Sequence, residues 1–239
     1  MSAHNPLANR TRIKICGMTR EQDVDAAVIA GADAVGFVIY PPSARYVSPE
    51  RAAELANRLP PFVTPVLLFV NEQVQVIRDA CGRIGACVVQ FHGDETLQHC
   101  LDATGNGARA FLRAARIPLD GAQPFDLVNF ASTFLQAQAI LLDAHVEGYG
   151  GGGKAFNWSR LPPSVNAHLV LSGVLTPANV TDGLAQVRPR CRSLSVDVSS
   201  GVEVSKGIKD PEKIHQFVAA VRAADKLLAL NQHALLSTT

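Results

Sequence analysis

Short runs of apolar residues, rich in Val, Ile and Leu, alternate along the chain with segments of mixed polarity. Most of the runs lack the strict apolar–polar alternation of a strand with one solvent-facing side. They instead resemble strands of a parallel sheet that is covered on both faces. A spacing of roughly 20 to 30 residues between runs is typical of repeated βα units. The pattern predicts eight strands, at residues 13–16, 34–39, 65–70, 86–91, 109–114, 139–143, 168–171 and 193–196.

Helix-start signals stand between several of these runs. Ser48-Pro49-Glu50 places a capping hydroxyl before a proline at the first helical position. The leucine-containing tail after Ala224 either extends the last helix or ends frayed. The signal at Ser48 recurs at Thr176-Pro177 and at Asp210-Pro211, and the three together predict helices over 51–58, 178–186 and 212–221.

Eight βα units in one chain favour a closed barrel over an open sheet. We expect an α/β protein with one (β/α)₈ TIM-barrel domain over residues 1–239. Its core covers about 12–222, between a polar N-terminal extension and the leucine-containing tail. An open doubly wound sheet is the alternative, because periodicity does not reveal closure. In a barrel, chemistry belongs at the C-terminal ends of the strands.

Composition narrows the class of protein. The chain has a net charge of +1, so no basic field is available to hold nucleic acid. No window reaches the ~20 apolar residues of a membrane span. Residues 1–11 contain no apolar secretory segment, and the five cysteines form neither a CxxC pair nor a metal-ligand spacing. We therefore expect a cytoplasmic protein with reduced thiols and without a metal or other cofactor.

Two residues at predicted strand ends are candidates for proton transfer. Cys16 follows the first strand, and Lys14, two residues earlier on the same face, would favour its thiolate. Asp143 ends the sixth strand, where burial can raise the pKa of a carboxyl group as a general acid requires. Asp197 ends the eighth strand in the same way. A small buried hydrophobe is the ordinary explanation for Cys16, and turn capping is the ordinary one for either aspartate.

Glycine-rich segments follow the last three strands. The run from Gly148 to Lys154, with Gly153, matches two nucleotide motifs only weakly, because it does not lie at a strand-to-helix turn. It is better interpreted as a mobile loop whose backbone can approach a ligand closely, for which a lid that excludes water is one use. Ser172-Gly173-Val174 and Ser199-Ser200-Gly201 follow strands seven and eight. Barrel enzymes often hold phosphate between these two loops, so a phosphorylated small molecule is the expected ligand.

Three further side chains are candidates for the barrel mouth. Arg45, in the loop after the second strand, can grip a carboxylate with two hydrogen bonds, although a solvated loop charge is commoner. Gln90 and His92 flank Phe91 at the end of the fourth strand, and one of them could face the mouth. A hydrogen-bonded structural histidine is the default interpretation of His92.

Taken together, these segments resemble the phosphoribosylanthranilate isomerases of tryptophan biosynthesis. The resemblance runs from about Arg12 to about Val221, and Val174 stands where that family commonly has a second glycine. The matching stretches are 14–19, 31–37, 43–48, 69–71, 89–93, 141–143, 149–158, 171–180 and 196–203.

The resemblance implies a (β/α)₈ barrel and an Amadori rearrangement of N-(5-phosphoribosyl)anthranilate. On the matching positions, Cys16 falls on the general base, Asp143 on the general acid and Arg45 on the residue that holds the anthranilate carboxylate. The turns with Gly173, Ser199, Ser200 and Gly201, together with Gly153, fall on the phosphate site. The reaction needs neither metal nor nucleotide.

Alternative functions remain open from the sequence. A different sugar-phosphate barrel, such as an epimerase or the related isomerase of the histidine pathway, is a second enzyme alternative. The histidine-pathway isomerase would be expected to use two carboxylates, with Asp where Cys16 stands. A barrel that binds phosphate without turnover is a non-catalytic alternative. The hypothesis of a nucleotide-binding protein is supported by the glycine run alone. We expect a monomer or a homodimer.

Overall fold

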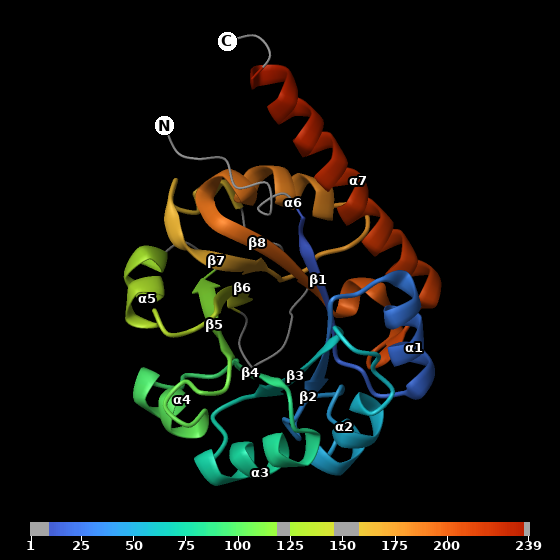
Figure 1. The fold of residues 1–239 in the computed structure, drawn as a ribbon, viewed down its shortest axis with the longest axis vertical. Helices are drawn as coiled ribbons and strands as arrows, with labels where there is room; N and C mark the ends of the chain where they lie inside the picture. The colour runs from blue at the N-terminus through green and yellow to red at the C-terminus, as the bar shows by residue number, and fades with distance from the viewer. Residues whose placement is uncertain (1–9, 119–124, 146–157, 237–239) are drawn as a thin grey trace.

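The computed structural model describes residues 10–118, 125–145 and 158–236 and contains a closed barrel of eight parallel strands. Each strand pairs with its neighbours in chain order, and β8 closes the ring against β1. In Figure 1 the strands form a central ring, and the helices surround it. The strands are β1 (Arg12–Cys16), β2 (Ala34–Val38), β3 (Thr64–Phe69), β4 (Val88–Phe91), β5 (Phe111–Pro118), β6 (Ala139–His145), β7 (Val165–Leu171) and β8 (Cys191–Val198).

Seven α-helices cover the outside of the barrel in the described part of the chain. A short turn of 3₁₀ helix, η4 (Ser200–Val202), follows β8, and a small hairpin of β9 (Glu203–Ser205) and β10 (Ile208–Lys209) comes next. The helices are α1 (Glu21–Ala30), α2 (Pro49–Ala56), α3 (Val74–Ile84), α4 (Leu97–Ala103), α5 (Leu127–Thr133), α6 (Val180–Val187) and α7 (Pro211–Leu236). Two more 3₁₀ turns are η2 (Trp158–Arg160) and η3 (Arg188–Arg190).

The eight predicted strands and the barrel are confirmed, and the open sheet is excluded. The prediction ended strand six at Asp143, which is wrong: β5 and β6 stay paired beyond it, through Arg116↔Asp143 to Pro118↔His145. Ser48 caps α2 as predicted, with its Oγ accepting from Arg51 N at 3.2 Å. The signal at Thr176 is displaced, because a turn intervenes and α6 begins only at Val180.

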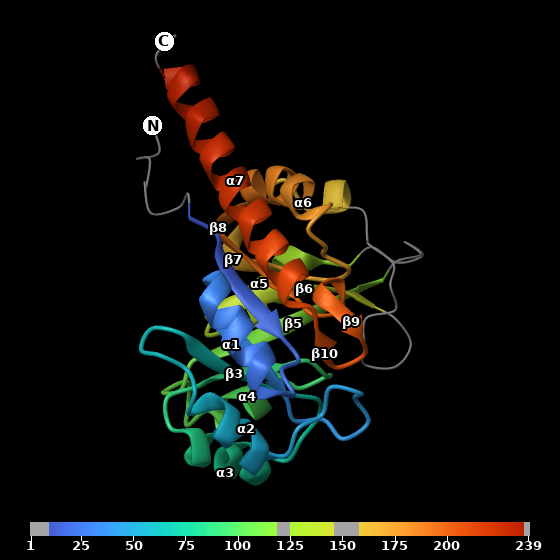
Figure 2. The same ribbon diagram turned by 90° about the vertical axis from the view of Figure 1, so that its right-hand side faces the viewer.

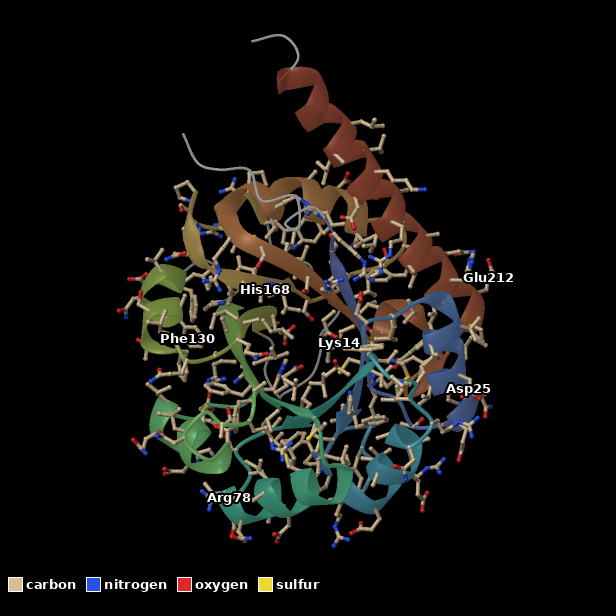
Figure 3. All side chains as sticks on the ribbon, in the orientation of Figure 1. Lys14, Asp25, Arg78, Phe130, His168 and Glu212 are labelled. Carbon is tan, nitrogen blue, oxygen red and sulfur yellow. The ribbon has the colours of Figure 1, made fainter. Side chains whose placement is uncertain are left out.

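The strands separate two kinds of side chain. Those facing the helices form one large apolar core, including Ile13, Ile15, Val89 and Leu142. Those facing the barrel axis form smaller apolar clusters interrupted by polar residues, and Figure 3 shows Lys14 and His168 within the ring of strands. Alternation along the strands is thus present, but it divides helix-facing from axis-facing positions rather than core from solvent.

Helix α7 is the longest element and includes most of the C-terminal tail. It continues as one helix to Leu236, so the tail extends the last helix. Figures 1 and 2 show its end projecting past the barrel. Leu227 and Leu230 are 56% and 65% exposed there. Asp225 anchors the helix to the barrel by accepting from Thr11 N at 2.8 Å and from Arg188 Nη2 at 2.6 Å.

The anchoring contact predicts a local difference in stability along α7. We expect Asp225→Ala to lower the free energy of unfolding by about 1–3 kcal/mol, because it leaves partly buried donors of Thr11 and Arg188 without their acceptor. Leu230→Gln, on the exposed side of the same helix, is the control and should change it by less than about 0.5 kcal/mol. Urea unfolding of both variants measures the difference; equal stabilities would contradict the anchor.

Candidate active site

The C-terminal ends of the strands surround one cavity, which we call the mouth cavity. Its lining brings together most of the side chains that the sequence analysis singled out, although they are far apart along the chain. Among the residues that line it are Cys16, Arg45, Gln90, His92, Asp143, Gly173, Asp197, Ser199 and Ser200.

Cys16 lies at the end of β1 and is 5% exposed. Lys14 shares its inward face, as the two-residue spacing predicts, and its ammonium is near enough to the thiol to interact with it electrostatically. Gly36 on β2 makes room for both, since a Cβ there would lie 2.7 Å from Cys16 Sγ and 3.0 Å from Lys14 Nζ. Lys14 Nζ also donates to Asp197 Oδ1 at 2.8 Å, across the β1–β8 seam.

The charges around Cys16 oppose one another. Burial raises the pKa of the Cys16 thiol, Lys14 opposes that rise, and Asp197 adds to it. Burial would lower the pKa of Lys14, but the charges of Asp197 and Cys16 outweigh burial and hold it above its ordinary value. In the free site, Cys16 is therefore a thiol at neutral pH, with the protonated Lys14 beside its sulfur.

Arg45 is held at the edge of the mouth cavity by a partner that the sequence analysis missed. Its Nε and Nη2 donate to the two carboxylate oxygens of Glu203 at 2.7 and 2.8 Å. Lys209 Nζ donates to the same carboxylate at 2.8 Å. Two cations therefore share one anion, and the surplus positive charge lies beside the cavity. The remaining guanidinium donors of Arg45 are oriented by this pairing for an anionic ligand.

A chain of side-chain contacts joins β4 to β6. Gln90 Nε2 lies 3.1 Å from His92 Nδ1, and His92 Nε2 lies 3.0 Å from Asp143 Oδ2. Gln90 is fully buried, which restrains the imidazole ring. With the amide nitrogen of Gln90 as donor, neutral His92 carries its proton on Nε2 and donates it to Asp143. Both Gln90 and His92 thus face the mouth, where the sequence analysis expected one of the two.

A buried ion pair beneath the Gln90–His92–Asp143 contacts holds the turn after β4. Arg113 is 5% exposed and donates to the carbonyl oxygens of Phe91 at 3.3 Å and Gly93 at 3.1 Å. Its Nη1 lies 3.5 Å from Glu95, whose other contacts include the Gly93 N–H at 2.9 Å. The turn that carries His92 is therefore fixed from both sides. No local motif announces this pair, because its residues come from different strands and loops.

The loops after β7 and β8 meet at the other side of the cavity. Gly173 and Val174 both have left-handed backbone conformations, with φ of 78° and 58°. Asn179 holds this path by donating to Val174 O at 2.9 Å and accepting from Thr176 N at 2.8 Å. Gly201 packs directly against the Leu175 carbonyl, leaving no space for a Cβ. Gly153 and the rest of the segment 148–154 lie outside the described residues.

Metal ligation finds no support in the part of the chain that the structure describes, where no group of three or more His, Cys, Asp or Glu side chains is arranged to hold an ion. The polar groups of the mouth cavity are instead paired with one another. A thiol beside an ammonium and a carboxyl beside an imidazole are the components of acid–base catalysis.

Two substitutions in the paired loops should change stability in opposite directions. Val174→Gly should raise the free energy of unfolding by up to about 1 kcal/mol, because relief of left-handed strain exceeds the added freedom of the unfolded chain. Gly201→Ala should lower it by about 1–3 kcal/mol, because its Cβ collides with the Leu175 backbone. Thermal unfolding of both variants is the measurement. A destabilised Val174→Gly would show that the valine packing outweighs the strain.

Comparison with known proteins identifies the family. The family model of N-(5'phosphoribosyl)anthranilate (PRA) isomerase matches residues 13–220. The N-(5'-phosphoribosyl)anthranilate isomerase of Dechloromonas aromatica is 58% identical over 217 residues, which cover 91% of this chain and 99% of that protein.

Solved structures agree with that assignment. The phosphoribosyl anthranilate isomerase of Thermus thermophilus superposes with a TM-score of 0.77 at 29% identity, covering 89% of this chain and 99% of the other. A phosphoribosyl anthranilate isomerase in complex with reduced 1-(o-carboxyphenylamino)-1-deoxyribulose 5-phosphate superposes with a TM-score of 0.69 at 35% identity, with the same coverage. The chain belongs to the N-(5'-phosphoribosyl)anthranilate isomerase family.

Proposed function

We propose that this chain catalyses the Amadori rearrangement of N-(5-phospho-β-D-ribosyl)anthranilate to 1-(2-carboxyphenylamino)-1-deoxy-D-ribulose 5-phosphate, in tryptophan biosynthesis. Family membership supports the reaction. The observation that carries the mechanism is the pairing of Cys16 with Lys14 on β1, facing the same cavity as Asp143 with His92. The reaction is an aldose–ketose isomerisation driven by one acid and one base.

Asp143 acts first in this mechanism, as the general acid. It protonates the furanose ring oxygen, so the C1–O bond breaks and the sugar opens to a Schiff base with the anthranilate nitrogen. The carboxylate left behind accepts a hydrogen bond from His92 Nε2. Because Gln90 fixes the ring, this donor is already in place when the charge develops, and little reorganisation is needed.

Cys16 acts second, as the general base. Its thiolate removes the proton from C2 of the Schiff base, and the resulting enolamine tautomerises to the ketone. A thiolate whose pKa is raised by burial is a strong base, although its population at neutral pH is small. Lys14 increases that population by stabilising the negative charge on sulfur, and Asp197 keeps Lys14 protonated and in position.

The remaining mouth residues hold the two ends of the substrate. Arg45, oriented by Glu203, binds the anthranilate carboxylate. The phosphate lies at the loops after β7 and β8, which Gly201 allows to approach each other closely. The phosphate-binding residues are Gly173, Ser199, Ser200, Gly201 and, outside the described residues, Gly153.

We further infer the setting of the enzyme. Its partner is a small phosphorylated substrate, and the net charge of +1 leaves no field for nucleic acid. Within the described ranges, no helix combines the length and apolar character needed to cross a bilayer. A cytoplasmic monomer or homodimer is the proposed state, and sedimentation of the purified protein distinguishes the two.

Separate replacement of the proposed acid and base tests the mechanism. Cys16→Ala and Asp143→Asn should each lower kcat by about 10²–10⁴-fold, measured as loss of anthranilate fluorescence on turnover. Cys100→Ala removes a thiol outside the mouth cavity and should keep near-normal turnover. If a folded Cys16 or Asp143 variant turns over normally, that residue is not the base or acid. Turnover of the histidine-pathway aminoaldose, with none of the anthranilate substrate, would overturn the function itself.

The pH dependence tests the role of Lys14. Activity that depends on the Cys16 thiolate increases as pH rises through the pKa of that thiol. Lys14→Met removes the cation and leaves Asp197 facing the sulfur, so the pKa of Cys16 rises further and the ascending limb of kcat/KM moves to higher pH. Lys14→Met/Asp197→Asn removes both charges and should move the limb back toward wild type. An unchanged ascending limb in Lys14→Met would show that Lys14 does not act on Cys16.

A further inference from the structure

A pair of cysteines lies at the opposite end of the barrel from the mouth cavity. Cys81 is in the last turns of α3, and Cys87 directly precedes β4. Both line a cavity of about 820 Å³, which we call the basal cavity, beside Thr64, Val88 and Ala110 near the beginnings of β3, β4 and β5. Both residues are thus buried, 2% and 7% exposed, at the wall of this cavity. The proposed mechanism uses neither of them.

A cation lies beside the two thiols. The Cys81 and Cys87 side chains are near enough to interact electrostatically. Arg109 Nη1 lies 3.3 Å from Cys87 Sγ and donates to Gly85 O at 2.6 Å. Among the described residues, no carboxylate pairs with Arg109, so its charge acts on the sulfur without a competing anion. The guanidinium therefore fastens the turn between the cysteines and faces Cys87.

The arrangement gives the two thiols different pKa values. The interaction with Cys81 lowers the pKa of Cys87, and Arg109 lowers it further against the effect of burial. The same interaction raises the pKa of Cys81, and burial adds to that rise. Cys87 is therefore the thiol of the pair that ionises first, and Cys81 keeps its proton to higher pH.

The other described cysteines lack this combination. Cys100 is fully buried, lines none of the cavities named above, and burial raises its pKa to about 12. Cys191 has no second thiol in contact, its Sγ lies 3.6 Å from Val187 O, and burial raises its pKa to about 11. They serve as internal references, because all of them are treated with the same reagent in one experiment.

We propose that Cys81 and Cys87 form an oxidisable dithiol, in which Cys87 attacks a small peroxide and Cys81 resolves the product into an intramolecular disulfide. In the first step the Cys87 thiolate attacks one peroxide oxygen. An S–O bond forms, the O–O bond breaks, and the departing hydroxide is protonated to water. In the second step Cys81 sulfur attacks the sulfenic sulfur, and the hydroxide that leaves takes the Cys81 proton as water. Two thiols and one hydrogen peroxide give one disulfide and two waters.

The turn between the cysteines can accommodate the new bond. The sulfurs must approach to about 2.05 Å, closer than in a hydrogen bond. Gly82 and Gly85 lie in the intervening segment, and a Cβ at either would have nothing within 4 Å. Gly85 also has a φ of 81°, a conformation that glycine adopts without strain. This short segment is held by Arg109 at the Gly85 carbonyl but has open space beside both glycines into which it can shift.

Mass spectrometry of peroxide-treated protein tests the proposal. A Cys16→Ala background removes the mouth thiol, so any oxidation reports on the remaining four cysteines. Treatment with hydrogen peroxide should lower the intact mass by about 2 Da, from loss of two hydrogens, and give a linked Cys81–Cys87 peptide. Adding Cys81→Ala should abolish the link and leave a sulfenic acid on Cys87 that dimedone captures. A linked peptide that involves Cys100 or Cys191 instead, or no link at all, would overturn the pair.

The role of Arg109 is tested by alkylation, which needs no disulfide. Cys87 should react with iodoacetamide faster than Cys100 near neutral pH, and Arg109→Gln should slow it by about tenfold. Arg78→Gln is the matched control, because Arg78 lines the same cavity but donates to the Asp102 carbonyl. Equal rates of Cys87 alkylation in the two arginine variants would show that Arg109 does not activate Cys87. Neither assay measures isomerisation, so its outcome is independent of the proposed enzyme function.

Discussion

Closure of the barrel between β1 and β8 is the constraint on which the site depends. It places Lys14 and Asp197 in register, with their charged atoms 2.8 Å apart and both side chains buried. Such a pair is costly to bury and is stable only with both partners present. Its ammonium then lies against Cys16. One contact thus joins the first and last strands and sets the electrostatic environment of the proposed base.

Other charged side chains at the mouth cavity are also held by ion pairs and hydrogen bonds between distant segments. Arg45 and Lys209 share Glu203, and His92 contacts Asp143, so the charged groups at the cavity are oriented by neighbours from distant segments. Groups fixed in this way need little rearrangement when a charged substrate arrives. Holding these charged groups in place requires support from the surrounding structure. Arg113 and Glu95 provide such support by holding the turn beneath His92.

The two ends of the barrel have different chemistry because the strands run parallel. All carboxyl ends meet at one rim, where loop residues converge on the mouth cavity, and all amino ends meet at the other. At that second rim the return from α3 to β4 brings Cys81 and Cys87 together beside Arg109. A reactive dithiol there is spatially separate from Cys16, although β4 leads directly from Cys87 toward Gln90 and His92.

The sequence by itself determined the eight strands and favoured a barrel with most of the candidate site residues at its mouth, because strand spacing and local composition are encoded within short segments. Closure was decided by the pairing of β8 with β1. The sequence did not reveal how far β5 and β6 stay paired beyond Asp143, since register depends on both strands together. Glu203, Lys209, Glu95 and Arg113 were missed as supporting residues, because their partners lie on other segments and no local pattern records them. Only the tertiary structure decided which charges neutralise one another, because burial and distance, rather than residue type, set each pairing.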